Sequence, residues 1–183
     1  IMNNKIYIDL SVLINTAFLT GIQRVSREIV LRLLKSPELD INLLCYSNEN
    51  EQFRLIDNDA FIDYYENKTG SASACILSKS LNINELDAGA VFFDIDSVWS
   101  CLMTRSTLYP LLKNQGLKII THVYDIIPIT HPQYCHENTV MHFIEYLGAT
   151  LQYADKLIVN TQATADQISM VCERMERKMP PYV

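Results

Sequence analysis

Leu19–Val30, which reads LTGIQRVSREIV, is the stretch that decides the fold. It follows an apolar, strand-like run at 5–10, and its glycine opens an amphipathic pattern that continues to about Lys35. Apolar and charged side chains alternate at helical spacing: the apolar ones are Ile22, Val25, Ile29 and Leu33, and the charged ones are Arg24, Arg27, Glu28 and Arg32. The pattern predicts a helix over 21–35 that begins directly after a glycine-containing loop.

This loop has two interpretations. A strand, a glycine loop and a helix start form the unit in which backbone N–H groups and the helix dipole meet an anion, often a phosphate. Thr20 and Gln23 also fit a capping box, which makes a plain helix start without any ligand. One glycine is a weaker signal than the full Gly-x-Gly-x-x-Gly fingerprint, which this chain lacks. From these residues alone, both interpretations remain open.

Composition limits the classes of protein to consider. The 183 residues are 49% hydrophobic, which predicts one globular domain with a substantial core. A net charge of −6 argues against a general nucleic-acid binder. The five scattered cysteines form no Cys-x-x-Cys pair, which predicts buried thiols in a reducing compartment. No apolar run approaches the roughly 20 residues that span a bilayer.

Apolar runs and helical patterns alternate along the chain. Strands are predicted at 5–10, 41–46, 91–95, 117–123 and 156–160, and helices at 21–35, 101–115, 139–154 and 161–176. Pro110 is expected to break or bend the second of these helices. The alternation predicts a parallel sheet with helices on both faces, and ligands bind beyond the carboxyl ends of such strands. The polar segment 47–89 predicts short strands and long loops, and we place no chemistry there.

A second informative segment is Ile119–Pro132, IITHVYDIIPITHP, in which a strand ends in a polar cluster. His122 and Tyr124 share one face of this strand, since side chains alternate along it, and Asp125 begins the following loop. The edge where ligands collect is therefore polar here. The structural alternative is that His122 is an interior histidine with its hydrogen bonds satisfied.

A third segment, Ala154–Ile168, combines a strand, an Asn-Thr pair and a helix. Asn160 and Thr161 fit a helix cap. This segment predicts either a second helix start that faces an anion or a purely structural cap.

Three motifs occur together in this order: Thr-Gly-Ile-Gln-Arg-Val-x-Arg-Glu at 20–28, Val-Tyr-Asp-Ile-Ile-Pro-x-x-His-Pro at 123–132, and Ala-Asp-x-Leu-Ile-Val-Asn-Thr at 154–161. Together they resemble the N-terminal half of retaining GT-B glycosyltransferases of family four, a group with many bacterial polysaccharide and O-antigen mannosyltransferases. The resemblance covers most of the chain apart from its middle region.

The resemblance implies an α/β, Rossmann-like parallel sheet with helices on both faces, which is one half of a GT-B fold. Residues 1–183 are expected to be a single N-terminal, acceptor-side domain. The C-terminal domain, which binds the donor and carries a Glu-x7-Glu motif, is expected to be absent from this chain. An isolated acceptor-side domain provides one wall of the cleft, so we expect it to show negligible transfer.

The resemblance also implies functional residues. In relatives the glycine loop lies under the donor diphosphate, a position that maps to Gly21, Thr20 and Arg24. Relatives commonly place a His-Asp pair at the end of the mid-chain strand, where this chain has Tyr124 and Asp125. The usual role of that histidine is therefore in doubt here.

His122, two residues earlier on the same face of the strand, is the substitute that this sequence offers. The expected catalytic set is therefore Tyr124, Asp125 and His122.

The implied partners are a nucleotide sugar and a glycan or lipid-linked acceptor. No cofactor, no metal and no nucleic acid are expected. The expected location is the cytoplasm, with peripheral attachment to the inner face of the cytoplasmic membrane as an open option.

A rival signal is the stretch VFFDIDSV at 91–98. An apolar strand followed by Asp-x-Asp resembles the first motif of haloacid-dehalogenase-type phosphatases, in which Asp94 would attack phosphorus and Asp96 would act as acid/base beside magnesium. The same pattern resembles the metal motif of GT-A glycosyltransferases. Against both, Asp57-Asn58-Asp59 shows how readily the pattern arises, and no downstream acidic pair follows.

In the GT-B interpretation, Asp94, Asp96 and Trp99 are expected on a loop that faces the cleft. Asp96 and Trp99 are then the expected acceptor-binding residues. Trp99 can stack on a sugar ring or pack as a partly buried core aromatic. A third alternative is a non-catalytic module that binds a sugar or a nucleotide.

Overall fold

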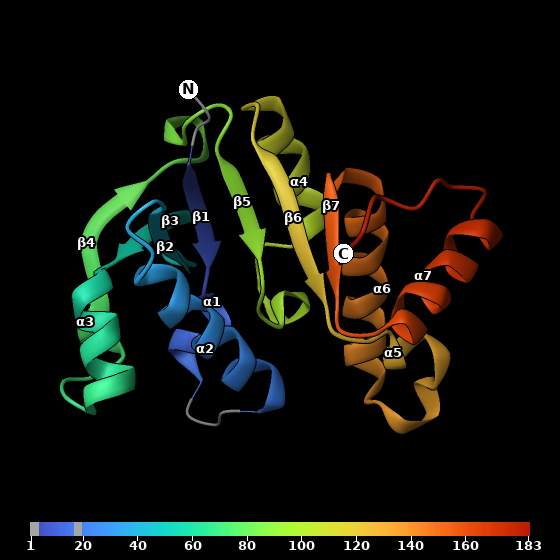
Figure 1. Cartoon of the computed structure of the whole chain (residues 1–183), viewed down its shortest axis with the longest axis horizontal. Coiled ribbons are helices and arrows are strands. Elements are labelled where there is room, and N and C mark those ends of the chain that lie inside the picture. Colours follow the sequence, from blue (N-terminus) through green and yellow to red (C-terminus); the bar gives the residue numbers. More distant parts are fainter. Residues whose placement is uncertain (1–3, 17–19) are drawn as a thin grey trace.

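The computed structural model describes residues 4–16 and 20–183. Within these residues seven strands form one sheet in the order β4-β3-β2-β1-β5-β6-β7 (Figure 1). The strands are β1 (Lys5–Asp9), β2 (Asp40–Ser47), β3 (Gln52–Ile56), β4 (Ile76–Leu81), β5 (Val91–Asp94), β6 (Lys118–Val123) and β7 (Lys156–Val159). β2, β1, β5, β6 and β7 pair in parallel, whereas β3 pairs antiparallel with both β2 and β4. The predicted α/β class and the five predicted strands are confirmed.

The helices follow the predicted pattern with shifts at their ends. They are α1 (Ser11–Asn15), α2 (Gly21–Leu34), α3 (Asn58–Ile62), α4 (Arg105–Asn114), α5 (Ile127–Thr130), α6 (Glu137–Tyr153) and α7 (Gln162–Arg174), with short 3₁₀ or π turns at Asp63–Asn67, Ser73–Cys75, Ile83–Glu85, Val98–Ser100 and Pro132–Tyr134. Of the two predicted effects of Pro110, a break or a bend, the break does not occur, because Pro110 lies inside α4, which continues to Asn114. The buried face of α4, with Leu108 and Leu112, holds the helix against the sheet.

Each face of the sheet carries its own core. Alternate side chains of β1 point to opposite faces: Ile8 packs with α1, α2 and α3, while Tyr7 packs with α4. A third cluster joins α6, α7 and β7 through Phe143, Leu157 and Ile168. The predicted helical cover on both faces is therefore confirmed. In the described ranges, no helix is long and apolar enough to cross a bilayer.

The buried face of α2 differs from the one that the apolar spacing predicts. Val25 is 41% exposed, whereas the polar Gln23 and Ser26 are buried together with Val30. The reason is that both polar side chains hydrogen-bond to the segment after β5, namely to Asp96–Ser97 and to the Ile95 carbonyl. The spacing of apolar residues therefore cannot predict the buried face of a helix when that face is polar and hydrogen-bonds to its neighbour.

The strand order contains a switch point between β1 and β5. The chain runs from β1 through α2 to β2 on one side, and later returns to β5 on the other side. Because β1, β5, β6 and β7 are parallel, their carboxyl ends share one edge, which lies toward the bottom of Figure 1 near α2 and α5. Ligands of open α/β sheets bind in the crevice at such a point.

Candidate functional site

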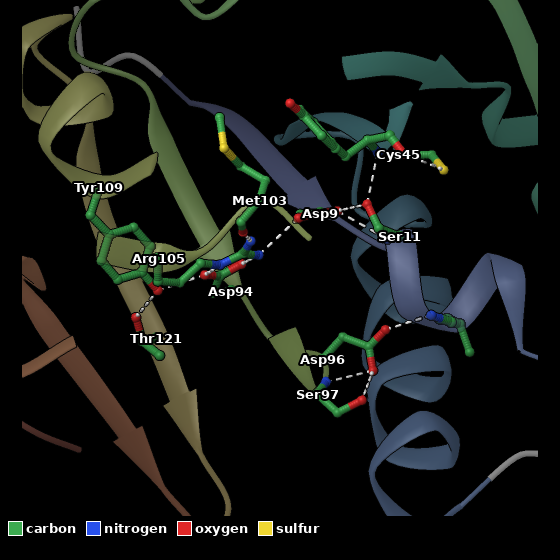
Figure 2. Close-up of polar contacts among 12 residues, drawn as sticks. Asp9, Ser11, Cys45, Asp94, Asp96, Ser97, Met103, Arg105, Tyr109 and Thr121 are labelled. Atoms are coloured by element: carbon green, nitrogen blue, oxygen red, sulfur yellow. Dashed lines mark hydrogen bonds and ion pairs between the residues drawn. The ribbon is translucent and has the colours of Figure 1, made fainter. Parts of the chain in front are cut away.

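A buried ion network lies at the switch point, where β1 and β5 end (Figure 2). Arg105, the first residue of α4, donates from Nε to Asp94 Oδ2 (2.7 Å) and from Nη2 to Asp94 Oδ1 (2.8 Å) and Asp9 Oδ2 (2.8 Å). Burial alone would lower the pKa of Arg105, but the carboxylates of Asp94 and Asp9 outweigh it and raise that pKa well above its ordinary value. The guanidinium therefore stays charged and ties the ends of β1 and β5 to α4.

The same network extends to β6 and α1. The Tyr109 hydroxyl donates to Asp94 Oδ2 (2.5 Å) and lies 3.2 Å from Thr121 Oγ1 on β6. Asp9 Oδ1 accepts the Ser11 N–H (3.0 Å) at the start of α1. The sequence interpretation missed Asp9 and Arg105. The sequence did offer one signal, because Asp9 and Asp94 each end an apolar strand. Carboxylates buried at such positions require a nearby cation, which indicates an arginine or lysine partner.

These contacts correct the phosphatase alternative. A nucleophilic aspartate must reach phosphorus, but the Asp94 side chain is fully buried and both of its oxygens are bonded to Arg105. The expectation that Asp94 and Asp96 lie on a cleft-facing loop is wrong for the same reason, since both are buried. Among the residues that the structure describes, no group of three or more His, Cys, Asp or Glu side chains is arranged to hold a metal ion.

Asp96 connects α1 and α2 to the segment after β5, and Figure 2 shows its contact with Ser97. Its Oδ2 accepts the Leu13 N–H of α1 (2.7 Å), and its Oδ1 accepts the Gln23 amide of α2 (3.0 Å) and the Ser97 N–H (2.7 Å). Burial raises the pKa of this carboxyl, while these hydrogen bonds oppose the shift. At 1% exposure, Asp96 holds α1 and α2 in place, and the expectation that it contacts an acceptor does not fit.

The capping box predicted for Thr20 and Gln23 does not form. Thr20 is the residue before α2, but it makes no capping bond to the backbone, and its hydroxyl donates to Gln23 Oε1 instead. Gln23 turns its amide toward Asp96 rather than back to Thr20. The start of α2 is therefore not capped by the side chain that was expected to cap it.

Gly21 begins α2 in open space. Among the residues that the structure describes, a Cβ added at this glycine would meet no atom within 4 Å beyond its chain neighbours and its own helix backbone, and Arg24, three residues on, is exposed. The N-terminus of α2 thus presents an exposed glycine, the positive end of a 14-residue helix and an exposed arginine.

The other predicted segments meet α2 at this edge. The Tyr124 hydroxyl, just beyond β6, donates to the Ile95 carbonyl (2.7 Å) and lies 3.1 Å from Ser26 Oγ. Ser26 Oγ in turn donates to the Ile95 carbonyl (2.8 Å). Burial raises the pKa of Tyr124 to about 12, although the Ser26 hydrogen bond opposes this. Tyr124 is therefore a protonated hydrogen-bond donor at neutral pH.

His122 connects Tyr124 with the segment after β7. Its ring stacks on that of Tyr124 with centroids 4.1 Å apart, and Nε2 lies 2.8 Å from Asn160 Oδ1. The Asn160 amide nitrogen points to the Tyr124 carbonyl (3.5 Å), so its oxygen accepts and His122 carries the proton on Nε2. His122 is 5% exposed, and its Nδ1 has no partner among the described residues.

The two remaining candidates, Asp125 and Trp99, lie near the carboxyl edge of the sheet. Asp125 is half-buried, and its Oδ1 accepts the Ile127 N–H at the start of α5 (2.9 Å). Trp99 is half-buried and packs on Phe143 (5.1 Å between centroids) and Tyr146 (5.5 Å), as the core-aromatic alternative anticipated. The structure brings together α2, Tyr124, His122 and Asn160, but it does not bring Trp99 into hydrogen-bonding contact with them.

One prediction follows from the shared Ile95 carbonyl. Either hydroxyl can donate to it, so Ser26→Ala and Tyr124→Phe should each cost no more than about 1 kcal/mol in free energy of unfolding. The double variant leaves the Ile95 carbonyl without either hydroxyl donor. Its loss in free energy of unfolding should exceed the sum of the two single losses by about 1 kcal/mol or more. Urea unfolding of the four proteins measures this coupling, and strict additivity would contradict it.

A second prediction concerns His122. Burial lowers its pKa from the ordinary 6.5, although the Asn160 hydrogen bond opposes this. Below pH 6.5 the unfolded chain then binds more protons at this position, so the free energy of unfolding falls as pH falls toward the folded-state pKa. Denaturation between about pH 5 and 8 should show this loss in the wild type and a smaller loss in His122→Gln. Identical profiles would show that His122 is not buried as described.

The fold and the site define a class of protein, a Rossmann-like α/β domain that is compatible with one half of a GT-B glycosyltransferase. At one edge of its sheet, polar residues follow the strands and α2 begins without a side-chain cap. The chain is similar to serotype-specific mannosyltransferase WbdA proteins of Escherichia coli, three of which match it with 27%, 27% and 26% identity over 166, 166 and 167 residues. The matches cover 90% of this chain and 18–19% of the relatives, so the chain spans about a fifth of their length. No protein-family model matches the chain. The resemblance to mannosyltransferase-like glycosyltransferases is confirmed.

Proposed function

We propose that this chain is the acceptor-side half of a retaining GT-B glycosyltransferase that moves a mannosyl residue from a nucleotide sugar to a glycan or lipid-linked glycan. The observation that carries the proposal is the meeting of α2, Tyr124 and Asn160 at the carboxyl edge of the sheet. The similarity to mannosyltransferases along 90% of the chain supports it. Peripheral attachment at the cytoplasmic face of the membrane would suit a lipid-linked acceptor.

The donor diphosphate is assigned to the start of α2. Its backbone N–H groups and the helix dipole favour a negative charge, and the open space at Gly21 lets a phosphate approach the backbone closely. Thr20 borders this position, and the exposed Arg24 supplies a positive charge. Groups fixed beside a departing diphosphate stabilise the charge that grows in the transition state.

The sugar-facing edge is assigned to Asp125, Tyr124 and His122. Asp125 is half-buried and uses one carboxylate oxygen on Ile127, which leaves the other to accept a sugar hydroxyl. Tyr124 and His122 are turned toward Ser26, Ile95 and Asn160, so they hold the loop of Asp125 against α2. Orientation of the acceptor hydroxyl near the anomeric carbon is the proximity part of catalysis.

Metal independence separates this function from the phosphatase and GT-A alternatives. In a protein that joins this chain to the proposed donor-binding half, transfer should continue at an unchanged rate in excess EDTA, because N–H groups and Arg24 neutralise the diphosphate. Product formation by chromatography is the measurement. Strict dependence on added magnesium or manganese would contradict the proposal.

The chain without a donor-binding half should act only as a binding module. One wall of a cleft cannot position a donor, so transfer by the 183-residue chain should be negligible. Rapid transfer by the chain alone would show that the assignment to one half is wrong.

A further inference from the structure

A cleft of about 590 Å³ opens beside α1, at the carboxyl ends of β1 and β2. Its polar lining includes Ser11, Asn15, Asn48, Glu49, Arg54 and Ser100. Small-molecule sites occupy roughly 300–1,000 Å³, so the cleft has the size of a ligand site. None of the residues expected to bind ligands lines it.

Hydrogen bonds within the protein hold the side of this cleft formed by α1 and β2 in place without a ligand. Ser11 Oγ accepts the Tyr46 N–H (2.7 Å), which ties the start of α1 to β2. The Asn15 amide donates to the Ser11 carbonyl (2.8 Å) and lies 3.5 Å from Cys45 Sγ. A cleft with fixed walls binds its ligand with a smaller loss of conformational entropy.

Unused hydrogen-bonding groups line the cleft. Arg54 donates from Nε to the Leu77 carbonyl (3.0 Å), while its two terminal nitrogens have no partner among the described residues. The side chains of Asn48 and Glu49 are exposed and likewise make no hydrogen bond within the described ranges. One guanidinium and one carboxylate cancel in charge, and the remaining polar groups are neutral. This mixture of donors and acceptors suits a neutral ligand rich in hydroxyl groups better than a phosphate.

The cleft and the start of α2 share one connecting element. α1 lines the cleft, and its Leu13 N–H donates to Asp96 (2.7 Å). The same carboxylate accepts the Gln23 amide of α2 (3.0 Å). A ligand in the cleft and a phosphate at α2 would therefore contact segments that Asp96 holds together.

We propose that this cleft, through Asn15, Asn48 and Arg54, binds the neutral carbohydrate of the acceptor. The proposal rests on the glycosyltransferase function and places its acceptor sugar beside α1 instead of at Asp96 and Trp99. It assigns acceptor recognition to residues that the sequence motifs do not contain.

NMR titration of the ¹⁵N-labelled chain tests this site directly. The probes are short α-linked manno-oligosaccharides, with gluco- and galacto-oligosaccharides in parallel. Saturable shifts are expected at Asn15, Asn48 and Arg54 with at least one probe. Arg54→Met should weaken binding about tenfold, because it removes hydrogen bonds from a charged group.

Asn48→Ala, on an exposed loop, should weaken binding roughly threefold to fivefold without affecting the fold. Arg32→Met, a matched change on the exposed surface of α2, should leave binding unchanged. Shifts that cluster at Trp99, or no saturable shift at the cleft with any probe, would overturn the proposal.

A nucleoside diphosphate titrated into the same sample separates this inference from the proposed function. Shifts at Gly21 without sugar binding at the cleft would overturn the cleft proposal and leave the donor site standing. Sugar binding at the cleft, combined with no transfer by the protein that also holds a donor-binding half, would support the cleft and contradict the enzymatic function.

Discussion

Gly21→Val should lower kcat/KM for sugar transfer by about a hundredfold in a protein that joins this chain to a donor-binding half. The valine side chain would occupy the open space before α2, where the diphosphate is proposed to approach the backbone. Loss of one fixed donor to a developing negative charge typically costs 10² to 10³ in rate. The melting temperature should change little, because an added Cβ meets no atom of the described part of the chain within 4 Å outside its own helix and chain neighbours.

Gly148→Val is the matched control for this variant. Gly148 also lies in a helix, α6, and an added Cβ there again meets no atom within 4 Å in residues 4–16 and 20–183 outside its own helix backbone and chain neighbours. Its kinetics should remain near those of the wild type. Equal kcat/KM for Gly21→Val and the wild type would remove the start of α2 from the donor site.

Arg105→Met should destabilise the chain by about 3–5 kcal/mol, the cost of removing one partner from a buried ion pair. Methionine fills much of the volume but leaves Asp9 and Asp94 buried without their cation. For a domain of this size the change corresponds to a melting temperature lower by roughly 6–20 °C. Thermal unfolding followed by circular dichroism measures it.

Two further variants show whether charge or volume causes the loss. Arg32→Met, on an exposed surface, should change the free energy of unfolding by less than about 0.5 kcal/mol. Asp9→Asn and Asp94→Asn added to Arg105→Met should recover part of the loss, because no unpaired buried charge remains. A stable Arg105→Met protein would contradict the described network.

The strands and helices could be predicted because buried elements show runs or periodic spacing of apolar residues in the sequence. β5 and β6 are covered on both faces, so apolar residues dominate their cores between polar loops: Val91, Phe92 and Phe93 in β5, and Ile119, Ile120 and Val123 in β6. The apolar pattern is weaker in the antiparallel pair β3 and β4, because β4 exposes Leu77, Ser78 and Lys79. This pair was anticipated only as short strands in a polar segment.

The candidate site could be predicted where its residues directly follow apolar strands. Tyr124 and Asn160 both do so, and parallel strands place such residues at one carboxyl edge of the sheet. Arg105 and Asp9 are separated by 96 positions, and no local pattern pairs them. Asp96 was misplaced because an aspartate beside a strand end is normally exposed, whereas here two backbone N–H groups and Gln23 compensate its burial.

Mass spectrometry of the acceptor tests the central claim most directly. A protein that joins this chain to a donor-binding half is incubated with a nucleotide-linked mannose and a mannose-containing glycan, in EDTA. The acceptor is expected to become heavier by whole hexosyl units, with less of this product for Gly21→Val. An acceptor of unchanged mass, while the donor is consumed by hydrolysis or not at all, would contradict the proposed function.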